Sequence, residues 1–207
     1  MPRSMQTSTS VLSGDDLRGM FAAGCACLEI NVDAINAVNV FPVPDGDTGT
    51  NMFLTLRAAT EAANRNQSDS VGEVASVMYQ ASFTGARGNS GVILSQLFKA
   101  LAFELDGRLD FGAAELSLIF RRGREYAYES VGMPVEGTIL PVMSSIADAA
   151  TTSVESGDTI PQLLEAVGAA ARHTVARTPD MLAVLRDAGV VDAGGQGLSV
   201  ILEGMRA

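Results

Sequence analysis

The sequence is poor in the side chains that build many catalytic and metal sites. Its 207 residues include one histidine, two cysteines and no tryptophan. Cys25 and Cys27 are too few and too close for a disulfide framework, and at i and i+2 of a helix they point to different faces. We expect them to be packing residues of a reduced, cytoplasmic protein. We expect His173, which has polar neighbours on a predicted helix, to lie at the surface. That leaves no histidine for a Ser-His-Asp triad or a histidine-rich metal site.

Positive charge is also scarce. The chain has 14 Lys and Arg residues against 24 Asp and Glu residues, so its net charge is −10. This balance argues against nucleic acid as a ligand, because nucleic-acid binding relies on basic patches. An acidic chain still binds nucleotides where Mg²⁺ carries part of the charge compensation. Lys99 is the only lysine, so phosphate contacts would have to come from arginine, backbone N–H groups, hydroxyls or a metal ion.

Long apolar runs are absent as well. No run approaches the roughly 20 residues needed to span a bilayer, so we expect no transmembrane segment. Residues 1–11 are polar and lack the apolar core of a secretory signal. We expect them to form a flexible N-terminus on a soluble, cytoplasmic protein.

The apolar residues that are present recur at helical spacing. They make up 47% of the chain while aromatics make up only 5%, so small and aliphatic side chains should fill the core. Ser13 is the expected cap of the first helix, with Asp15 and Asp16 in its first turn, and Thr178-Pro-Asp180 is the expected end of a later helix. The predicted helices span residues 13–38, 52–63, 71–83, 92–105, 111–130, 138–154, 160–177, 180–188 and 198–205. No linker separates them, so we predict one all-α domain over residues 12–207.

The most informative segment is Asn39-Val-Phe-Pro-Val-Pro-Asp-Gly-Asp-Thr-Gly-Thr-Asn-Met52. It places Asp45 and Asp47 on either side of a glycine that gives the backbone freedom to curl around an ion. Oxygen ligands of this kind hold hard cations such as Mg²⁺ and leave coordination positions open for phosphate. The flanking residues add further oxygen donors: Asn39, Thr48, Thr50 and Asn51. The alternative interpretation is a proline-rich turn in which Asp47 or Thr48 caps a helix that starts near Asn51.

A second segment, Gly85-Ala-Arg-Gly-Asn-Ser-Gly91, precedes a strongly apolar helix. Its glycines let consecutive N–H groups converge, and a helix N-terminus adds positive potential, so the segment is suited to binding phosphate. It is not a P-loop, which requires Gly-Lys-[Ser/Thr] after four intervening residues. Arg87 is a candidate for a direct phosphate contact. The alternative is an ordinary helix cap at Asn89 or Ser90.

Two further segments are candidates for nucleotide contacts. Pro134-Val-Glu-Gly-Thr-Ile-Leu140 opens a helix, where Thr138 either lines a pocket or caps the helix. Val190-Val-Asp-Ala-Gly-Gly-Gln-Gly197 joins the last two helices. Its glycines permit close backbone approach, and Asp192 offers an acceptor for a ribose or base. Gly189 fits equally well as the glycine stop of the preceding helix.

These four segments, in this order, resemble the ATP-binding (DhaL-like) domain shared by dihydroxyacetone kinases and bacterial fatty acid kinases. The proline-rich aspartate loop and the Ala-Arg-Gly-Asn-Ser-Gly segment are more similar to the fatty acid kinase branch. The resemblance covers about residues 12–205. It implies an all-α antiparallel barrel of about eight helices, with ATP and one or two Mg²⁺ ions held in loops at one end.

The resemblance also implies residue roles. Asp45 and Asp47 would be the catalytic metal ligands. The dihydroxyacetone kinase pattern has another aspartate where this chain has Val40, so Asn39 is the expected third ligand. The other implied contacts to phosphate and nucleotide come from Thr48, Thr50, Asn51, Arg87, Asn89, Ser90, Gly91, Thr138 and Asp192.

The implied fatty acid kinase reaction transfers the γ-phosphoryl group of ATP to a fatty acid carboxylate presented by a separate fatty-acid-binding protein. Such a carboxylate is ionised at pH 7 and needs no general base, so catalysis would rest on positioning and charge neutralisation. Two alternatives stay open: the ATP-binding subunit of a dihydroxyacetone kinase, and a non-catalytic nucleotide-binding regulatory module. Fatty acid kinases continue beyond a domain of this size, so we expect the N-terminal domain of a longer protein. Its C-terminal domains and a second copy of the chain are further candidate partners.

Overall fold

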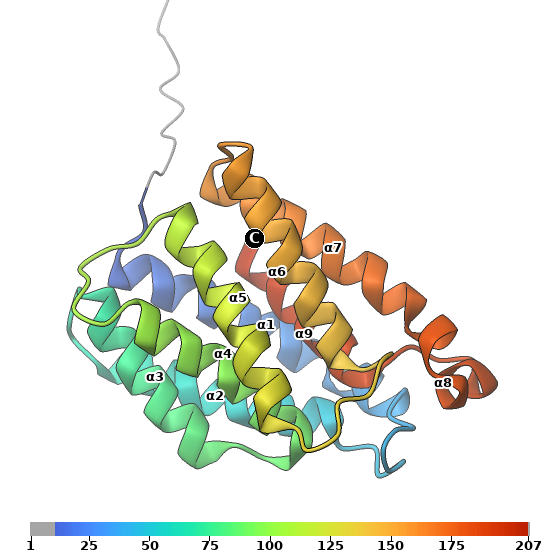
Figure 1. Cartoon of the computed structure of the whole chain (residues 1–207). Helices are drawn as coiled ribbons and strands as arrows, with labels where there is room; N and C mark the ends of the chain where they lie inside the picture. The colour runs from blue at the N-terminus through green and yellow to red at the C-terminus, as the bar shows by residue number, and fades with distance from the viewer. Residues whose placement is uncertain (1–10, 207) are drawn as a thin grey trace, which may run out of the picture.

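The computed structural model describes residues 11–206, which form nine α-helices joined by short connections (Figure 1). The helices are α1 (Gly14–Ala37), α2 (Thr48–Arg65), α3 (Val71–Gly85), α4 (Gly88–Glu104), α5 (Ala113–Ser130), α6 (Ile139–Glu155), α7 (Ile160–Met181), α8 (Ala183–Ala188) and α9 (Ala193–Arg206). Within this range the only β-type pairing is an isolated bridge between Leu12 and Phe111, so the all-α prediction is confirmed. The segment 1–11, predicted to be flexible, lies outside the described residues except for Val11.

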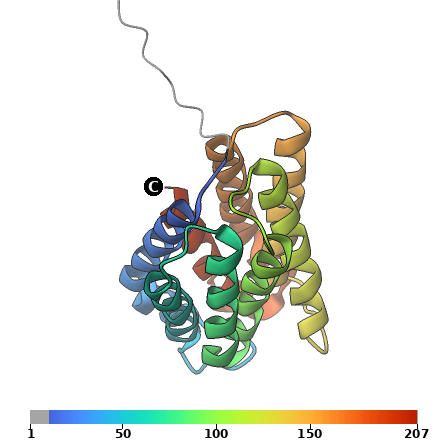
Figure 2. The ribbon, with the colours of Figure 1, turned by 90° about the vertical axis from the view of Figure 1, so that its left-hand side faces the viewer.

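Eight of these helices form a closed ring (Figures 1 and 2). Each helix from α1 to α7 packs on the next, α9 packs on α7, and α9 closes the ring against α1. The short helix α8 lies in the connection between α7 and α9. Short connections make consecutive helices antiparallel. The predicted antiparallel barrel of about eight helices is therefore confirmed.

The inside of the barrel is filled largely by aliphatic side chains from all around the ring. Leu28, Met52, Phe98, Ile146 and Leu163 come from five different helices and are each less than 2% exposed. Burial of such side chains supplies most of the favourable free energy of folding. None of the helices between residues 11 and 206 is both long and apolar enough to cross a membrane.

The cysteines and the histidine lie where the sequence predicts. Cys25 is buried and Cys27 is half-buried on α1, and both are free thiols. Burial raises the pKa of the Cys25 thiol, which favours the unreactive protonated form. His173 is exposed on α7. These residues therefore serve packing and surface roles.

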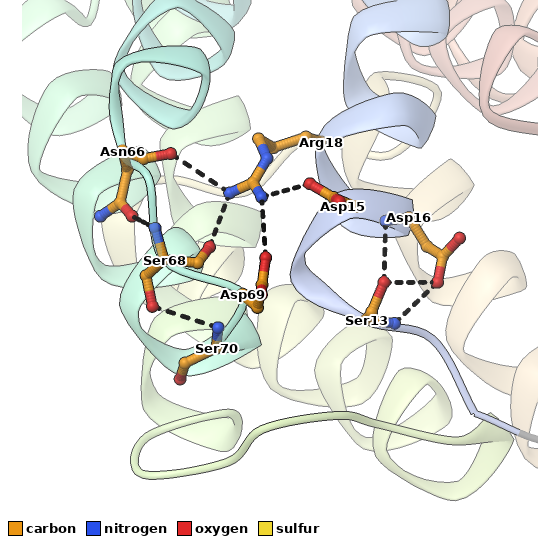
Figure 3. A network of polar contacts seen from close by, with 8 residues as sticks. All are labelled: Ser13, Asp15, Asp16, Arg18, Asn66, Ser68, Asp69 and Ser70. Atoms are coloured by element: carbon orange, nitrogen blue, oxygen red, sulfur yellow. Dashed lines mark hydrogen bonds and ion pairs between the residues drawn. The ribbon is translucent and has the colours of Figure 1, made fainter.

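The start of α1 is tied to the turn between α2 and α3 by a polar network (Figure 3). Ser13 caps α1 as predicted: its Oγ accepts the Asp16 N–H at 3.3 Å, and the Asp16 carboxylate accepts the Ser13 N–H at 2.8 Å. The hydrogen bonds that the Asp16 carboxylate accepts from the Ser13 N–H and from the Ser13 hydroxyl, at 2.7 Å, lower the pKa of Asp16. Arg18 donates to the carbonyl oxygens of Asn66 and Ser68 at 3.4 and 2.9 Å. The network fixes one end of the barrel.

Three helices begin earlier than the sequence predicts, because glycines in their first turns are used for packing. The observed first residues are Thr48, Gly88 and Ala193, in place of Met52, Val92 and Leu198. Glycine is a poor helix former by propensity, but here it lets the helix starts approach their neighbours. A Cβ on Gly49 would lie 2.6 Å from the Val32 carbonyl oxygen of α1, and one on Gly197 would lie 2.6 Å from the Met52 sulfur. Larger residues would push these helices apart.

Helix α7 continues through Pro179 to Met181, so the predicted end at Thr178-Pro-Asp180 is wrong. Proline removes the N–H that would bond to the Val175 carbonyl. The Thr178 hydroxyl donates to that carbonyl at 2.7 Å instead, and the helix is not broken. After α8 the chain turns at Gly189, whose φ of +67° suits glycine. The predicted glycine stop is confirmed.

Candidate functional site

Four helix N-termini meet at the end of the barrel away from the Arg18 network. Because consecutive helices are antiparallel, α2, α4 and α6 all begin at this end, and α9 begins there too (Figure 1). A cavity of about 640 Å³ opens between them. Helix N-termini carry unpaired N–H groups and partial positive charge, so this end of the barrel favours an anionic ligand.

The cavity brings together most of the predicted site residues, although they come from four widely separated segments. The predicted residues that line it are Asn39, Asp45, Asp47, Thr48, Asn51, Asn89, Ser90, Thr138 and Asp192. Thr50, Arg87 and Gly91 are not among its lining residues. Arg87 is exposed, and Gly91 is buried so close to Thr55 that an added Cβ would overlap the Thr55 hydroxyl. Gly91 therefore shapes the site from behind.

The loop before α2 is organised by the buried side chain of Asn39. Its Oδ1 accepts from the Thr48 hydroxyl at 2.7 Å, from the Thr48 N–H at 3.1 Å and from the Asp47 N–H at 3.3 Å. Its Nδ2 donates to the Val43 carbonyl at 3.1 Å. One side chain thus ties both ends of the aspartate loop together.

A second asparagine, Asn36 in the last turn of α1, holds the beginning of α2. Its Oδ1 accepts the N–H groups of Gly49 and Thr50 at 2.8 and 3.2 Å, and its Nδ2 donates to the Thr50 hydroxyl at 3.0 Å. The side chain of Asp47, at the N-cap position, forms no capping bond within the described chain. Asp47 is therefore the N-cap residue by position, as the alternative interpretation expects, but its carboxylate does not cap the helix, and Thr48 is the first helical residue.

The carboxylates of Asp45 and Asp47 are left available for a cation. Both residues are exposed and line the cavity, with Gly46 between them at a φ of +66°. Mg²⁺ is commonly bound by one or two carboxylates, with water and phosphate oxygens completing its shell, and this donor set fits that pattern. Between residues 11 and 206 no group of three His, Cys, Asp or Glu side chains gathers at a point. Asn39 as a third ligand stays a prediction, and its Oδ1 already accepts three hydrogen bonds.

The turn before α4 differs from the sequence expectation. Arg87 occupies the N-cap position, so Asn89 and Ser90 lie in the first helical turn and the predicted cap at either of them is wrong. Both still line the cavity. Gly88 has a φ of +57°, and a Cβ there would lie 2.5 Å from the Asn51 amide nitrogen. The glycine lets the α4 start lie directly against α2.

The four helix starts differ in how their N–H groups are used. At α2, the side chains of Asn36 and Asn39 accept the first N–H groups of the helix. The Thr138 hydroxyl accepts the Leu140 N–H of α6 at 3.5 Å, and the Asp192 carboxylate accepts the Gly195 N–H of α9 at 2.7 Å. At α4 the Thr55 hydroxyl accepts the Arg87 N–H at 3.2 Å, and no side chain of the described residues accepts the N–H groups of Gly88, Asn89 and Ser90. These N–H groups are therefore the ones most available to an anion.

Asp192 is the one carboxylate of the cavity that is buried. Burial raises its pKa from the ordinary 3.8 to about 6, against the opposing effect of hydrogen bonds from the Gly195 and Gly194 N–H groups. The Asp192 N–H donates to the Thr178 hydroxyl at 3.0 Å, so the residue is held at both backbone and side chain. Its predicted contact with a ribose or base stays a prediction.

An apolar wall that no sequence motif predicted completes the cavity. Its residues come from α4, from the segment between α5 and α6 and from the start of α6: Val92, Ile93, Val131, Met133, Val135, Ile139 and Leu140. In the sequence, apolar residues at a helix start look the same whether they line a pocket or pack in the core. The cavity is thus polar where the aspartate loop and the α4 start meet and apolar on the side of the α5–α6 segment.

A sequence model of the DAK2 domain matches residues 42–207. The chain belongs to this family. It is 41% identical to protein YloV of Bacillus subtilis over 97% of this chain and 36% of YloV, and 42% identical to an uncharacterised protein of Staphylococcus haemolyticus over 94% of this chain and 35% of that protein. This chain spans about a third of the length of these relatives.

The fold is also that of a solved structure. The crystal structure of the dihydroxyacetone kinase from C. freundii in complex with AMP-PNP and Mg²⁺ matches with a TM-score of 0.69. The match covers 91% of this chain and 33% of the kinase chain, at 19% identity. The DhaL-like helical fold expected from the sequence is confirmed.

Proposed function

We propose that this chain is a Mg·ATP-binding phosphotransferase domain. The observation that carries the proposal is the position of the α4 start, where the N–H groups of Gly88, Asn89 and Ser90 have no side-chain acceptor among the described residues. Its first-turn residues Asn89 and Ser90 line the same cavity as the Asp45 and Asp47 carboxylates. A phosphate chain placed between them meets N–H donors on one side and a metal site on the other.

The charge of the cavity supports a metal-bound anion. Its ionisable lining residues are three aspartates, with no lysine or arginine among the residues that line it. The only lysine, Lys99, instead stacks on the Tyr126 ring at 4.0 Å from the ring centroid. A polyphosphate without a cation would be repelled by the carboxylates. Mg²⁺, as one or two ions, would neutralise the phosphate charge and polarise the transferred group.

Different residues of the cavity would bind the metal ion, the phosphates and the nucleoside. Asp45 and Asp47 would hold the metal, and Asn39 would either join them or keep the loop in shape. Asn51, Asn89 and Ser90 would orient the phosphates. Thr48 would contact the phosphates, with Thr138 and Asp192 near the nucleoside, whereas Thr50, Arg87 and Gly91 do not line the cavity and would support the site from around it. The C. freundii kinase of the same fold was crystallised with AMP-PNP and Mg²⁺, which supports this choice of ligand.

We propose a fatty acid carboxylate, held by a separate fatty-acid-binding protein, as the phosphoryl acceptor. Of the three aspartates in the cavity, two would bind metal and the third, Asp192, is buried and caps α9. No further carboxylate or imidazole lines the described cavity to serve as a general base. An acceptor that is already ionised needs none, whereas a hydroxyl acceptor needs its proton removed. The product would be an acyl phosphate, made in the cytoplasm.

Nucleotide binding is tested by isothermal titration calorimetry with Mg·ATP. Asp45→Ala and Asp47→Ala should each abolish Mg²⁺-dependent ATP binding while the helical circular dichroism stays unchanged. Asp106→Ala is the matched control, because Asp106 is an exposed aspartate that does not line the cavity. Unchanged affinity in both cavity variants would disprove the metal-ligand assignment.

The acceptor is tested with the full-length protein of which this chain is proposed to be the N-terminal domain. ATP consumption with a fatty-acid-binding protein and fatty acid supports the proposal. Consumption with dihydroxyacetone and its binding subunit would assign the chain to dihydroxyacetone kinases instead. Mg·ATP binding without a phosphorylated product from either acceptor would identify a regulatory module.

A further inference from the structure

The first four N–H groups of α2 have no partners within the helix, as in any α-helix. They belong to Asp47, Thr48, Gly49 and Thr50. Asn39 Oδ1 accepts the first two, at 3.3 and 3.1 Å. Asn36 Oδ1 accepts the other two, at 2.8 and 3.2 Å. Two asparagine oxygens from outside the helix therefore satisfy its whole N-terminus.

This arrangement reverses the usual role of an N-cap aspartate. An aspartate at the N-cap commonly accepts the N–H of the second or third helical residue with its own carboxylate. In this chain those N–H groups belong to Gly49 and Thr50, and Asn36 already holds them. The Asp47 carboxylate makes no capping bond inside residues 11–206 and lines the cavity.

The packing of α1 on α2 makes this substitution of one cap for another possible. Asn36 lies in the last turn of α1, and a Cβ on Gly49 would lie 3.0 Å from its Oδ1 and 2.6 Å from the Val32 carbonyl oxygen. The glycine therefore lets the start of α2 reach the asparagine. The bond from Asn36 Nδ2 to the Thr50 hydroxyl, at 3.0 Å, fixes which way the amide faces.

We propose that Asn36 is a positioning residue of the nucleotide site, which caps α2 in place of Asp47 and so leaves the Asp47 carboxylate available to the metal ion. The role of Asp47 as a metal ligand rests on the proposed function. The capping of α2 by Asn36 in place of Asp47 rests on the hydrogen bonds alone. Without Asn36, the N-cap side chain of Asp47 is the residue placed by its position to accept the Gly49 and Thr50 N–H groups. Metal binding and helix capping would then compete for one side chain.

The test is the Asn36→Ala variant, studied by Mg²⁺ titration of ATP binding, thermal unfolding and crystallography. The free energy of an ordinary helix N-cap corresponds to a factor of about five in an equilibrium constant. Because capping by Asp47 would compete with metal binding, the Mg²⁺-dependent affinity for ATP should fall about fivefold. The melting temperature should change little, because Asp47 takes over the cap. The crystal structure should place an Asp47 carboxylate oxygen within hydrogen-bond distance of the Gly49 or Thr50 N–H.

Two variants separate positioning from a general loss of stability. Asn31→Ala is the matched control: Asn31 is on the same helix, and its only side-chain hydrogen bond within residues 11–206 is donated to the Cys27 carbonyl, at 2.8 Å. Its removal should leave the Mg²⁺ dependence unchanged. Asn36→Asp keeps an acceptor for α2 and should restore the affinity lost in Asn36→Ala. If Asn36→Ala does not fold, Asn36→Gln moves the amide oxygen by one methylene and should weaken the Mg²⁺ dependence in the same direction.

The outcomes distinguish this inference from the proposed function. If the unmodified chain binds Mg·ATP and the Asn36 variants bind it with the same Mg²⁺ dependence, the positioning role is overturned. An Asp47 carboxylate that stays in the cavity in the variant crystal overturns it as well. If the unmodified chain fails to bind Mg·ATP, the proposed function is wrong. The crystal structure of Asn36→Ala still decides whether Asp47 caps α2 when Asn36 is removed.

Discussion

Replacing Asp192 by asparagine should stabilise the protein above pH 6 and remove part of its pH dependence. Asp192 is 6% exposed, and its only charge-compensating contacts among the described residues are backbone N–H groups at the start of α9. Asparagine has nearly the same shape and keeps an oxygen to accept the Gly195 N–H. The substitution therefore removes a buried charge while preserving the cap.

The size of the effect follows from the pKa of Asp192, which burial raises from 3.8 to about 6. At about 1.4 kcal/mol per pKa unit, ionising this carboxyl costs the folded state at most about 3 kcal/mol above pH 6. Since the folded pKa is the higher one, the folded state binds the proton more tightly between pH 4 and 6. Stability should therefore rise as the pH falls from above 6 towards 4, by about 1.4 kcal/mol between pH 7.5 and pH 5.

The assay is urea unfolding followed by circular dichroism, at several pH values between 5 and 7.5. The free energy of unfolding of Asp192→Asn should exceed that of the unmodified protein at pH 7.5, and the two should converge as the pH falls. Asp106→Asn, at an exposed aspartate, controls for the loss of one negative charge. Parallel pH curves for the unmodified protein and Asp192→Asn would refute the assignment of a buried, raised-pKa carboxyl.

Three other substitutions test the packing and the loop. Gly91→Ala should lower stability by about 1–3 kcal/mol through overlap with Thr55, and chemical unfolding should show partial recovery in the Gly91→Ala/Thr55→Ala double variant. Arg18→Ala should cost about 1–2 kcal/mol, because two hydrogen bonds to carbonyl groups are lost; calorimetry should find its Mg·ATP affinity unchanged, since Arg18 lies at the other end of the barrel. Asn39→Ala should lower both thermal stability and Mg²⁺-dependent ATP affinity. Unchanged thermal stability with lost Mg²⁺-dependent affinity would favour a direct role of Asn39 as a metal ligand.

The sequence was sufficient for the fold class and for the position of most helices. Apolar residues at helical spacing and the Ser13 cap are local signals, and the structure confirms both. Errors came where local propensity and tertiary packing disagree. Gly49 and Gly197 weaken a helix in isolation, but each is needed where two helices come too close for a side chain. Pro179 is tolerated because a threonine hydroxyl satisfies the carbonyl that it leaves unpaired.

The candidate site was predictable where side-chain chemistry is concentrated in short segments. Asp45, Asp47, Asn89 and Ser90 lie in motifs that combine glycine with oxygen donors, and all four line the cavity. Asn36 was missed because it is one polar residue in the last turn of a long helix. Only the approach of α2 to that turn gives the residue its role.

The sequence by itself determined that this is an all-helical chain with two carboxylates and a glycine-rich turn, because these depend on local spacing and residue type. The tertiary structure decided that α2, α4, α6 and α9 begin at the same end of the barrel, since this depends on the antiparallel order of the ring. It also decided which helix starts are capped and by what. As a result, N–H groups of the α4 start and the carboxylates of the aspartate loop face one cavity. The sequence alone does not determine this, because packing decides which residues of distant segments become hydrogen-bond partners.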